Sequence, residues 1–210
     1  FHASGPVTLM VPKDSVWITA SHGPAYSITR VKSWAKQVDA VNLKVKVGRL
    51  ALPVDFGSWR SGDVHVHMNY GGNYRNTPEQ TVKQAEAEGL NFVYNLIVNK
   101  EQRIPDVSIF APGPDPASNA NVTFLFGQEF HTSFWGHLGL LNLKEHLILP
   151  DYVGYPQTAV SSLYPHNGFV ADAAHKQGAF VGYVHPYEIP EIFPGQAATI
   201  SHTDPIDAAL

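Results

Sequence analysis

The segment SGDVHVHMNYGG, residues 61–72, places His65 and His67 two positions apart in a pattern typical of a β-strand. Side chains at positions i and i+2 of a strand point to the same face, so these two imidazoles share one side. Imidazole is the commonest metal ligand among side chains and is neutral enough at pH 7 to bind an ion. The spacing therefore fits two ligands of one metal ion, and it also fits two solvated side chains on an exposed strand.

Three more potential ligands stand at the ends of predicted strands. Glu129 ends NVTFLFGQE, His185 ends AFVGYVH, and His137 begins HLGLLNL. Each has a simpler explanation when taken alone, such as a cap or a loop hydrogen bond to the backbone. Taken together with the histidine pair they favour a metal site, because functional groups of barrels gather at strand ends. His131 follows Glu129 by two residues and is predicted to act in the same pocket as an acid or base.

The composition excludes several other kinds of site. The 210 residues include no cysteine, which rules out disulfides and leaves nitrogen and oxygen ligands for any transition metal. The formal net charge is -4 without a block of Lys or Arg, which argues against nucleic-acid binding through a basic surface. No apolar run approaches the roughly 20 residues of a membrane span. The predicted partner is a small-molecule substrate, and the oligomeric state stays open.

The elements that would position these residues change in character along the chain. In residues 1–57, short runs such as SVWITA and the alternating VNLKVKV at 41–47 predict a small β-sandwich-like module. From residue 58 onward, predicted strands alternate with helices. Such alternation is typical of an α/β fold with a parallel sheet or barrel. The predicted domains are therefore 1–57 and 58–210.

Two helices in the second domain have clear end signals. Thr77 is the predicted N-cap of TPEQTVKQAEAEG, Pro78 its first residue and Gly89 its terminator. The segment GFVADAAHKQG predicts a second helix that ends at Gly178. The chain begins with Phe rather than Met and stops soon after a helix-start signal at 203–205, so we expect both domains to be incomplete.

The ordered motifs GDVHVHMN, GQE, GHLGLLNL and VHP resemble the PHP superfamily (polymerase and histidinol phosphatase). The form SWRSGDVHVH after a β-rich module is similar to its CehA/McbA branch, typified by carbaryl hydrolase. The resemblance covers about residues 58–190 and implies a distorted (β/α)7 barrel with up to three divalent ions at the strand ends. The metal ligands that it implies, with the carboxylate bridging, are His65, His67, Glu129, His137 and His185.

Two departures from that family pattern change the expected metal count. The Asp-His pair that usually ends the second barrel strand is replaced by Ile97 and Val98, which cannot bind a metal ion. The late motif with a metal-binding Asp does not occur before Leu210. We therefore expect one or two ions of Zn²⁺, Mn²⁺ or Fe²⁺.

The predicted function is a metal-dependent hydrolase of an ester, amide, carbamate or phosphoester, in which a metal-activated water attacks the substrate. Tyr187 and Glu188 are further candidates for a role in its pocket. The alternative is a non-catalytic PHP-like binding module with a degenerate metal site. The compartment stays open, with an extracytoplasmic one favoured.

Overall fold

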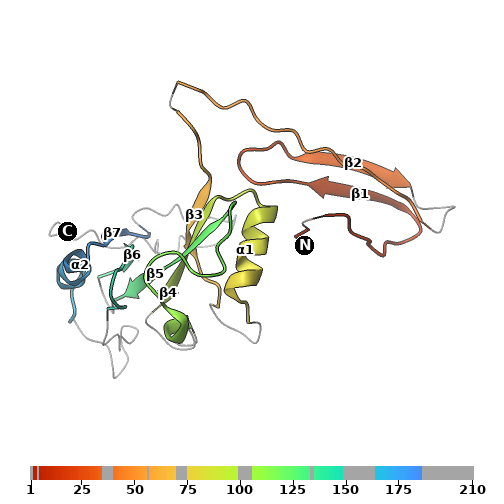
Figure 1. The fold of residues 1–210 in the computed structure, drawn as a ribbon. Coiled ribbons are helices and arrows are strands. Elements are labelled where there is room, and N and C mark those ends of the chain that lie inside the picture. The colour runs from red at the N-terminus through yellow and green to blue at the C-terminus, as the bar shows by residue number, and fades with distance from the viewer. Residues whose placement is uncertain are drawn as a thin grey trace, which may run out of the picture.

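The computed structural model describes residues 2–3, 5–34, 40–55, 57–69, 75–98, 106–132, 135–148 and 164–185. Within these ranges the chain forms two separate β-sheets and two α-helices (Figure 1). Strands β1 (Ser15–Ala20) and β2 (Thr29–Trp34) pair antiparallel as a small sheet that extends away from the larger one. The larger sheet has the order β3-β4-β5-β6-β7.

The direction of each strand in the larger sheet decides which ends meet. The strands are β3 (Gly62–Val66), β4 (Phe92–Val98), β5 (Thr123–His131), β6 (His137–Leu141) and β7 (Phe180–Tyr183). The first three are parallel, whereas β6 runs antiparallel to both β5 and β7. The carboxyl ends of β3, β4, β5 and β7 therefore share one edge with the amino end of β6.

The predicted (β/α)7 barrel is wrong. The described chain is mostly strands, and the five-stranded sheet curls into a half-barrel with two short helices. The described part of the β4–β5 connection has a short 3₁₀ turn at 106–109 in place of an α-helix. Only residues 132–136 join β5 to β6, which is too short for a parallel crossover of a dozen or more residues. A tight antiparallel hairpin is the result.

The predicted β-sandwich-like module is also wrong. Among the described residues before β3, a single two-stranded sheet is present and no second sheet packs on it. The predicted strand 41–47 is extended chain without a ladder of its own. Its neighbourhood is held by a Thr29 hydroxyl that donates to the Lys46 carbonyl at 2.9 Å and by a Tyr26–Arg49 bridge. Alternating polarity fits an extended segment as well as a paired strand, so the pattern could not distinguish them.

Both predicted helices are confirmed. The helix α1 (Pro78–Ala87) begins after Thr77, whose hydroxyl accepts a hydrogen bond from the Gln80 amide, and the chain leaves it through Gly89 at φ +65°. The helix α2 (Asn167–Lys176) is followed by Gly178 at φ +76°. Each helix is ten residues long, so neither of these two described helices could span a bilayer.

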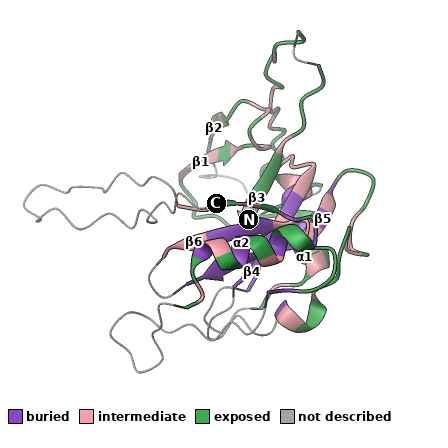
Figure 2. Cartoon of the chain, turned by 90° about the vertical axis from the view of Figure 1, so that its left-hand side faces the viewer, coloured by how far each residue is buried: buried purple, intermediate pink, exposed green. Residues whose placement is uncertain are grey.

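The core lies between the two helices and the convex face of the larger sheet. Alternate residues of β5 and β6, among them Phe124, Phe130 and Leu138, pack with Val82 of α1 and Val170 of α2 in one buried cluster (Figure 2). A fully buried side chain of this size contributes roughly 1.5–3 kcal/mol to folding. Because strand side chains alternate, burying this set against the helices directs the intervening residues to the concave face.

Candidate metal centre

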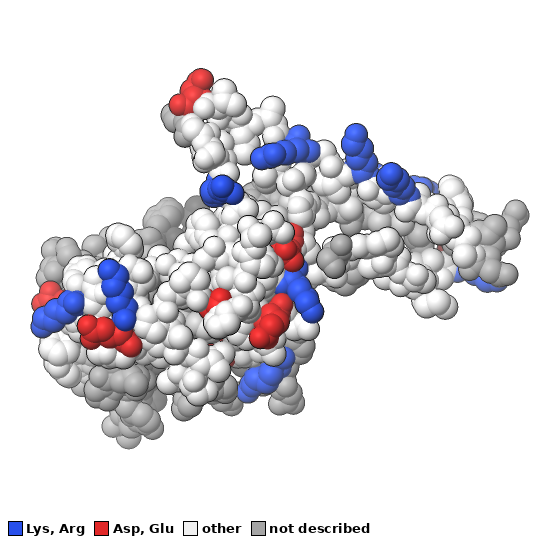
Figure 3. All heavy atoms as spheres, in the orientation of Figure 1, with Lys and Arg blue, Asp and Glu red and all other residues white. Residues whose placement is uncertain are grey.

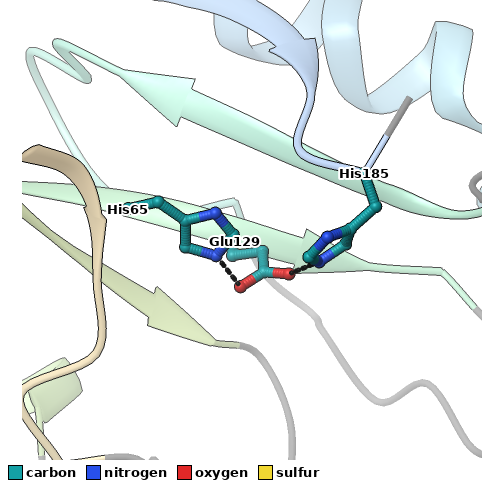
Figure 4. A group of neighbouring side chains, drawn as sticks. All are labelled: His65, Glu129 and His185. Carbon is teal, nitrogen blue, oxygen red and sulfur yellow. Dashed lines mark hydrogen bonds and ion pairs between the residues drawn. The ribbon is translucent and has the colours of Figure 1, made fainter. Parts of the chain in front are cut away.

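Five imidazoles converge on one buried carboxylate at the shared edge of the larger sheet. Glu129 lies near the end of β5, and its side chain is 2% exposed. The ring nitrogens within 3.4 Å of its two oxygens come from His65, His67, His131, His137 and His185. Figure 4 shows three of these residues, which reach the same point from three different segments. The structure thus brings together the five predicted metal ligands and His131.

Strand alternation explains why these side chains meet. Glu129 and His131 are two residues apart on β5 and so share its concave face. His137 pairs with His131 across the β5–β6 hairpin and falls on the same face. His65 lies near the end of β3, His67 directly follows this strand, and His185 follows β7. His137 begins its strand, and the antiparallel hairpin brings that amino end to the same edge as the carboxyl end of β5.

One oxygen of Glu129 faces the histidine pair of β3. Its Oε2 lies 3.1 Å from His65 Nε2 and 2.7 Å from His67 Nε2, and these two nitrogens are 3.2 Å apart. His67 Nδ1 lies 2.8 Å from the Leu96 carbonyl, an acceptor, so Nδ1 carries a proton. In the neutral ring, Nε2 then carries no proton, and its lone pair points at a carboxylate oxygen. Such a contact requires a cation, either a proton or a metal ion.

The other oxygen of Glu129 faces three imidazoles. Its Oε1 lies 3.0 Å from His137 Nδ1, 3.1 Å from His131 Nε2 and 3.4 Å from His185 Nε2. A carboxylate oxygen has two lone pairs, so three donated protons exceed what it accepts well. The rings of His131 and His137 stack with centroids 3.6 Å apart and an interplanar angle of 2°. Two charged imidazolium rings would repel in this arrangement.

Electrostatics keeps the central carboxylate ionised. Burial alone would raise the pKa of Glu129, but the surrounding imidazoles of His131, His137, His65 and His67 outweigh that effect and hold this pKa well below its ordinary range. In turn, the hydrogen bond to Glu129 raises the pKa of His65 above 6.5 against the opposing effect of burial. The site therefore holds a negative charge at neutral pH and attracts cations.

The residues of the site differ in their exposure to solvent. Glu129 and His131 are buried, whereas His65, His137 and His185 are partly exposed, with the His185 side chain at 40%. Two groups of three residues have ligand atoms within 4.8 Å of one another: His65 with Glu129 and His185, and Glu129 with His131 and His137. The cluster could hold a metal ion.

A buried polar network that the sequence analysis missed fixes the segment carrying the histidine pair. Asn95 of β4 accepts a hydrogen bond from the Met68 amide at 2.8 Å and donates to Asp106 at 3.2 Å. Asn69 donates to the other oxygen of Asp106 at 2.7 Å. These hydrogen bonds fix the position of the backbone directly after His67. The signal in the sequence is the lone Asn95 inside the apolar run FVYNLIV.

The other described histidines lie away from the cluster. His166 caps α2 by accepting from the Phe169 amide, and His22 bonds the Ala87 carbonyl at the end of α1. His175 is exposed on α2. Tyr187 and Glu188 lie outside the described residues, as do His202 and the segment 203–205.

Comparisons with models of known families, with curated proteins and with solved structures give no match to this chain. The candidate site therefore depends on the geometry and chemistry of the chain's own residues.

Proposed function

We propose that this cluster binds two divalent metal ions bridged by Glu129 and that the protein is a metal-dependent hydrolase. The observation that carries the proposal is the convergence of five imidazole nitrogens on the two oxygens of one buried carboxylate. Nitrogen and oxygen ligands of this kind suit Zn²⁺, Mn²⁺ or Fe²⁺.

The first ion fits between Glu129 Oε2 and the histidine pair. Three atoms separated by 3.2, 3.1 and 2.7 Å lie on a circle with a radius of about 1.7 Å, which is below the Zn–N and Zn–O distances of about 2.0–2.2 Å. One ion can therefore reach His65, His67 and the carboxylate together. Two ligands of a tetrahedral ion are about 3.3 Å apart, close to the observed separation of the two nitrogens.

The second ion fits beside Glu129 Oε1, with His137 and His185 as its nitrogen ligands. The planes of these two rings are 72° apart, so one ion can lie in both planes at once. The parallel rings of His131 and His137 cannot share an ion in this way without rotation. His131, 3.1 Å from Glu129 Oε1, is accordingly left out of the metal ligands and keeps the role of an acid or base in the same pocket.

Such an ion supplies Lewis acidity and lowers the pKa of a coordinated water from about 15.7 towards about 7. The chain's own residues hold and position the ions. Glu129 holds the negative charge that keeps cations in place, and His67 is fixed by its bond to the Leu96 carbonyl. The partly exposed rings of His65, His137 and His185 leave one side open to a substrate.

The order of motifs that resembles the CehA/McbA branch also supports a hydrolase. This support comes from the motifs alone, since the sheet is not the barrel of that family. The ion-pair partners of Glu129 among the described residues are all histidines. A phosphoester would favour Arg or Lys at this edge, so we favour an ester, amide or carbamate as the substrate.

The second candidate function is a non-catalytic metal-binding module. Val98 pairs with Glu129 in the sheet and is fully buried, so a hydrocarbon side chain stands where the family carries a ligand. The two candidates differ in coordination, because a catalytic site keeps an open position whereas a structural site is closed. Added azide should change the visible spectrum of the Co²⁺-loaded chain only if a position is open.

The hydrolase proposal is tested with the intact chain loaded with Zn²⁺ or Mn²⁺. Nitrophenyl esters, carbamates and phosphoesters serve as substrates, before and after chelation. Replacing His65 and His67 together by Ala should lower the rate by at least about 100-fold. The matched control replaces His146 and His175, which are exposed and outside the cluster. Hydrolysis that survives chelation would contradict the proposal, and a closed metal site without hydrolysis would favour the second candidate.

A further inference from the structure

One face of the β1–β2 sheet combines exposed tryptophans with cations. The register pairs Trp17 with Lys32, and Trp34 lies at the end of β2 on the same face. Arg30 lies 4.5 Å from the centre of the Trp17 ring, and Lys32 lies 4.7 Å from the centre of the Trp34 ring. Trp17 is 55% exposed and Trp34 is 58% exposed. We call these four residues the Trp-cation face.

Large apolar side chains are also exposed elsewhere in this part of the chain. Among the described residues, 12 of the 17 exposed large hydrophobic residues lie between residues 7 and 59, a segment that supplies about a third of the described residues. They include Met10 and Ile28, which are aliphatic. Contiguous exposed apolar surface marks an interaction site in a folded chain, and Trp17 and Trp34 share one exposed face. The sheet also extends away from the five-stranded body, which leaves the face accessible (Figure 1).

The charge of this part is opposite to that of the rest of the chain. Residues 1–55 contain seven Lys or Arg and three Asp, a net charge of +4. Residues 56–210 contain seven Lys or Arg and fifteen Asp or Glu, a net charge of -8. In Figure 3, basic side chains follow the upper edge of the β1–β2 part, while the acidic ones lie mostly over the body. The surface is therefore complementary to an anionic partner.

The ring geometry distinguishes between anionic partners. A nucleobase or a sugar ring stacks on an open aromatic face, and cations over both indoles, Arg30 and Lys32, reduce the area left for such stacking. Binding at a bilayer interface does not require an uncovered ring face, because Trp lies among the headgroups with its apolar ring inward and its N–H in water. Lys and Arg beside it meet lipid phosphates, and aliphatic neighbours enter the acyl boundary.

We propose that the Trp-cation face docks the protein on the surface of an anionic lipid bilayer. This inference is independent of the metal centre, which lies on the other sheet. It concerns attachment to the surface and involves no spanning segment.

The test is sedimentation of the intact chain with vesicles. Vesicles of equal parts phosphatidylcholine and phosphatidylglycerol should bind it at low salt, and vesicles of phosphatidylcholine alone should not. The variant with both Arg30→Glu and Lys32→Glu should lose at least about 30-fold in affinity, since each cation near an anionic surface contributes roughly 1 kcal/mol. The matched control, Lys83→Glu with Lys144→Glu, makes the same charge change on exposed residues of the body and should bind normally.

A second readout locates the contact. Brominated lipid should quench the tryptophan fluorescence of the wild type, and Trp17→Phe with Trp34→Phe should remove most of that quenching. Absence of binding to the anionic vesicles, equal binding by the charge-reversed variant, or equal binding to neutral vesicles would each overturn the proposal. Binding to single-stranded DNA or a sulfated polysaccharide in preference to vesicles would also overturn it.

Discussion

Glu129 is a buried carboxylate whose ion-pair partners in the described residues are imidazoles only. Burial of a charge is costly unless it is compensated, and neutral imidazoles compensate it only through their protons. A neutral His67 has one proton and cannot donate it to both the Leu96 carbonyl and Oε2, and three nitrogens crowd Oε1. Divalent ions between these atoms resolve the conflict, which is why we place them there.

The first prediction at the residue scale concerns protons released on metal binding. The hydrogen bond to Glu129 raises the pKa of His65 above 6.5 in the metal-free chain. An ion binds only the unprotonated ring, so it must displace this proton, and the apparent affinity should rise with pH until the pH exceeds that raised pKa. Calorimetric titration in two buffers of different ionisation enthalpy counts the protons. The His65→Ala variant should release fewer protons on metal binding. A metal affinity that is independent of pH between 5 and 8 would contradict the assignment of His65 as a ligand.

At the scale of elements, the end of β4 shows which of two apolar residues matters. Val98 pairs with Glu129 in parallel register, so the two side chains share the concave face. Ile97 points to the opposite face, where it belongs to the hydrophobic core with Phe126 and Phe130. The sequence treated Ile97 and Val98 alike, because a motif comparison does not distinguish the faces of a strand.

The second prediction follows from this alternation. Val98→His should strengthen metal retention, because it adds a nitrogen beside Glu129 with little disturbance of the core. Ile97→His is the matched variant and should instead lower the free energy of unfolding by at least about 2 kcal/mol, since it buries an unpaired polar ring. Metal content and denaturant unfolding of both variants provide the measurement. Similar behaviour of the two variants would mean that the register of β4 against β5 is different.

The third prediction concerns the close approach of the strands beneath the cluster. A Cβ at Gly127 of β5 would lie 2.7 Å from the Leu140 carbonyl oxygen and 2.9 Å from Leu96 Cδ2, whereas a Cβ at Gly182 of β7 would meet nothing within 4 Å. Gly127→Ala should therefore destabilise the chain by about 1–3 kcal/mol and loosen metal binding, since it forces β5 and β6 apart. Gly182→Ala should leave both the unfolding free energy and the metal content near the wild-type values. Equal effects of the two substitutions would argue against the described sheet.

At the scale of the whole molecule, local signals were more informative than the overall pattern. The caps at Thr77 and Gly178 are short-range chemistry, and α1 begins and α2 ends where these signals place them. The ligands could be found because their side-chain types and strand-end positions are visible in one dimension. The direction of β6 was not visible, since HLGLLNL reads the same for either direction. The short 132–136 connection, rather than the strand pattern, was the signal for a hairpin and against a barrel.

The same limit applies to the first part of the chain. The alternation at 41–47 predicted a strand of a sandwich, yet pairing depends on a partner far away in the sequence, and the described residues provide only β1 and β2 as a ladder. Likewise, the Asn95–Asp106 network joins residues from separate segments and could be recognised only in three dimensions.

The central claim is tested most directly by anomalous diffraction from crystals of the intact chain prepared with Zn²⁺ or Mn²⁺. We predict two peaks on either side of the Glu129 carboxylate. One should lie beside His65 and His67, and the other beside His137 and His185. A map without any peak among these residues, in protein that has been saturated with metal, would contradict the claim. Three fully occupied ions would contradict the count of two and would require ligands beyond the six residues of the cluster.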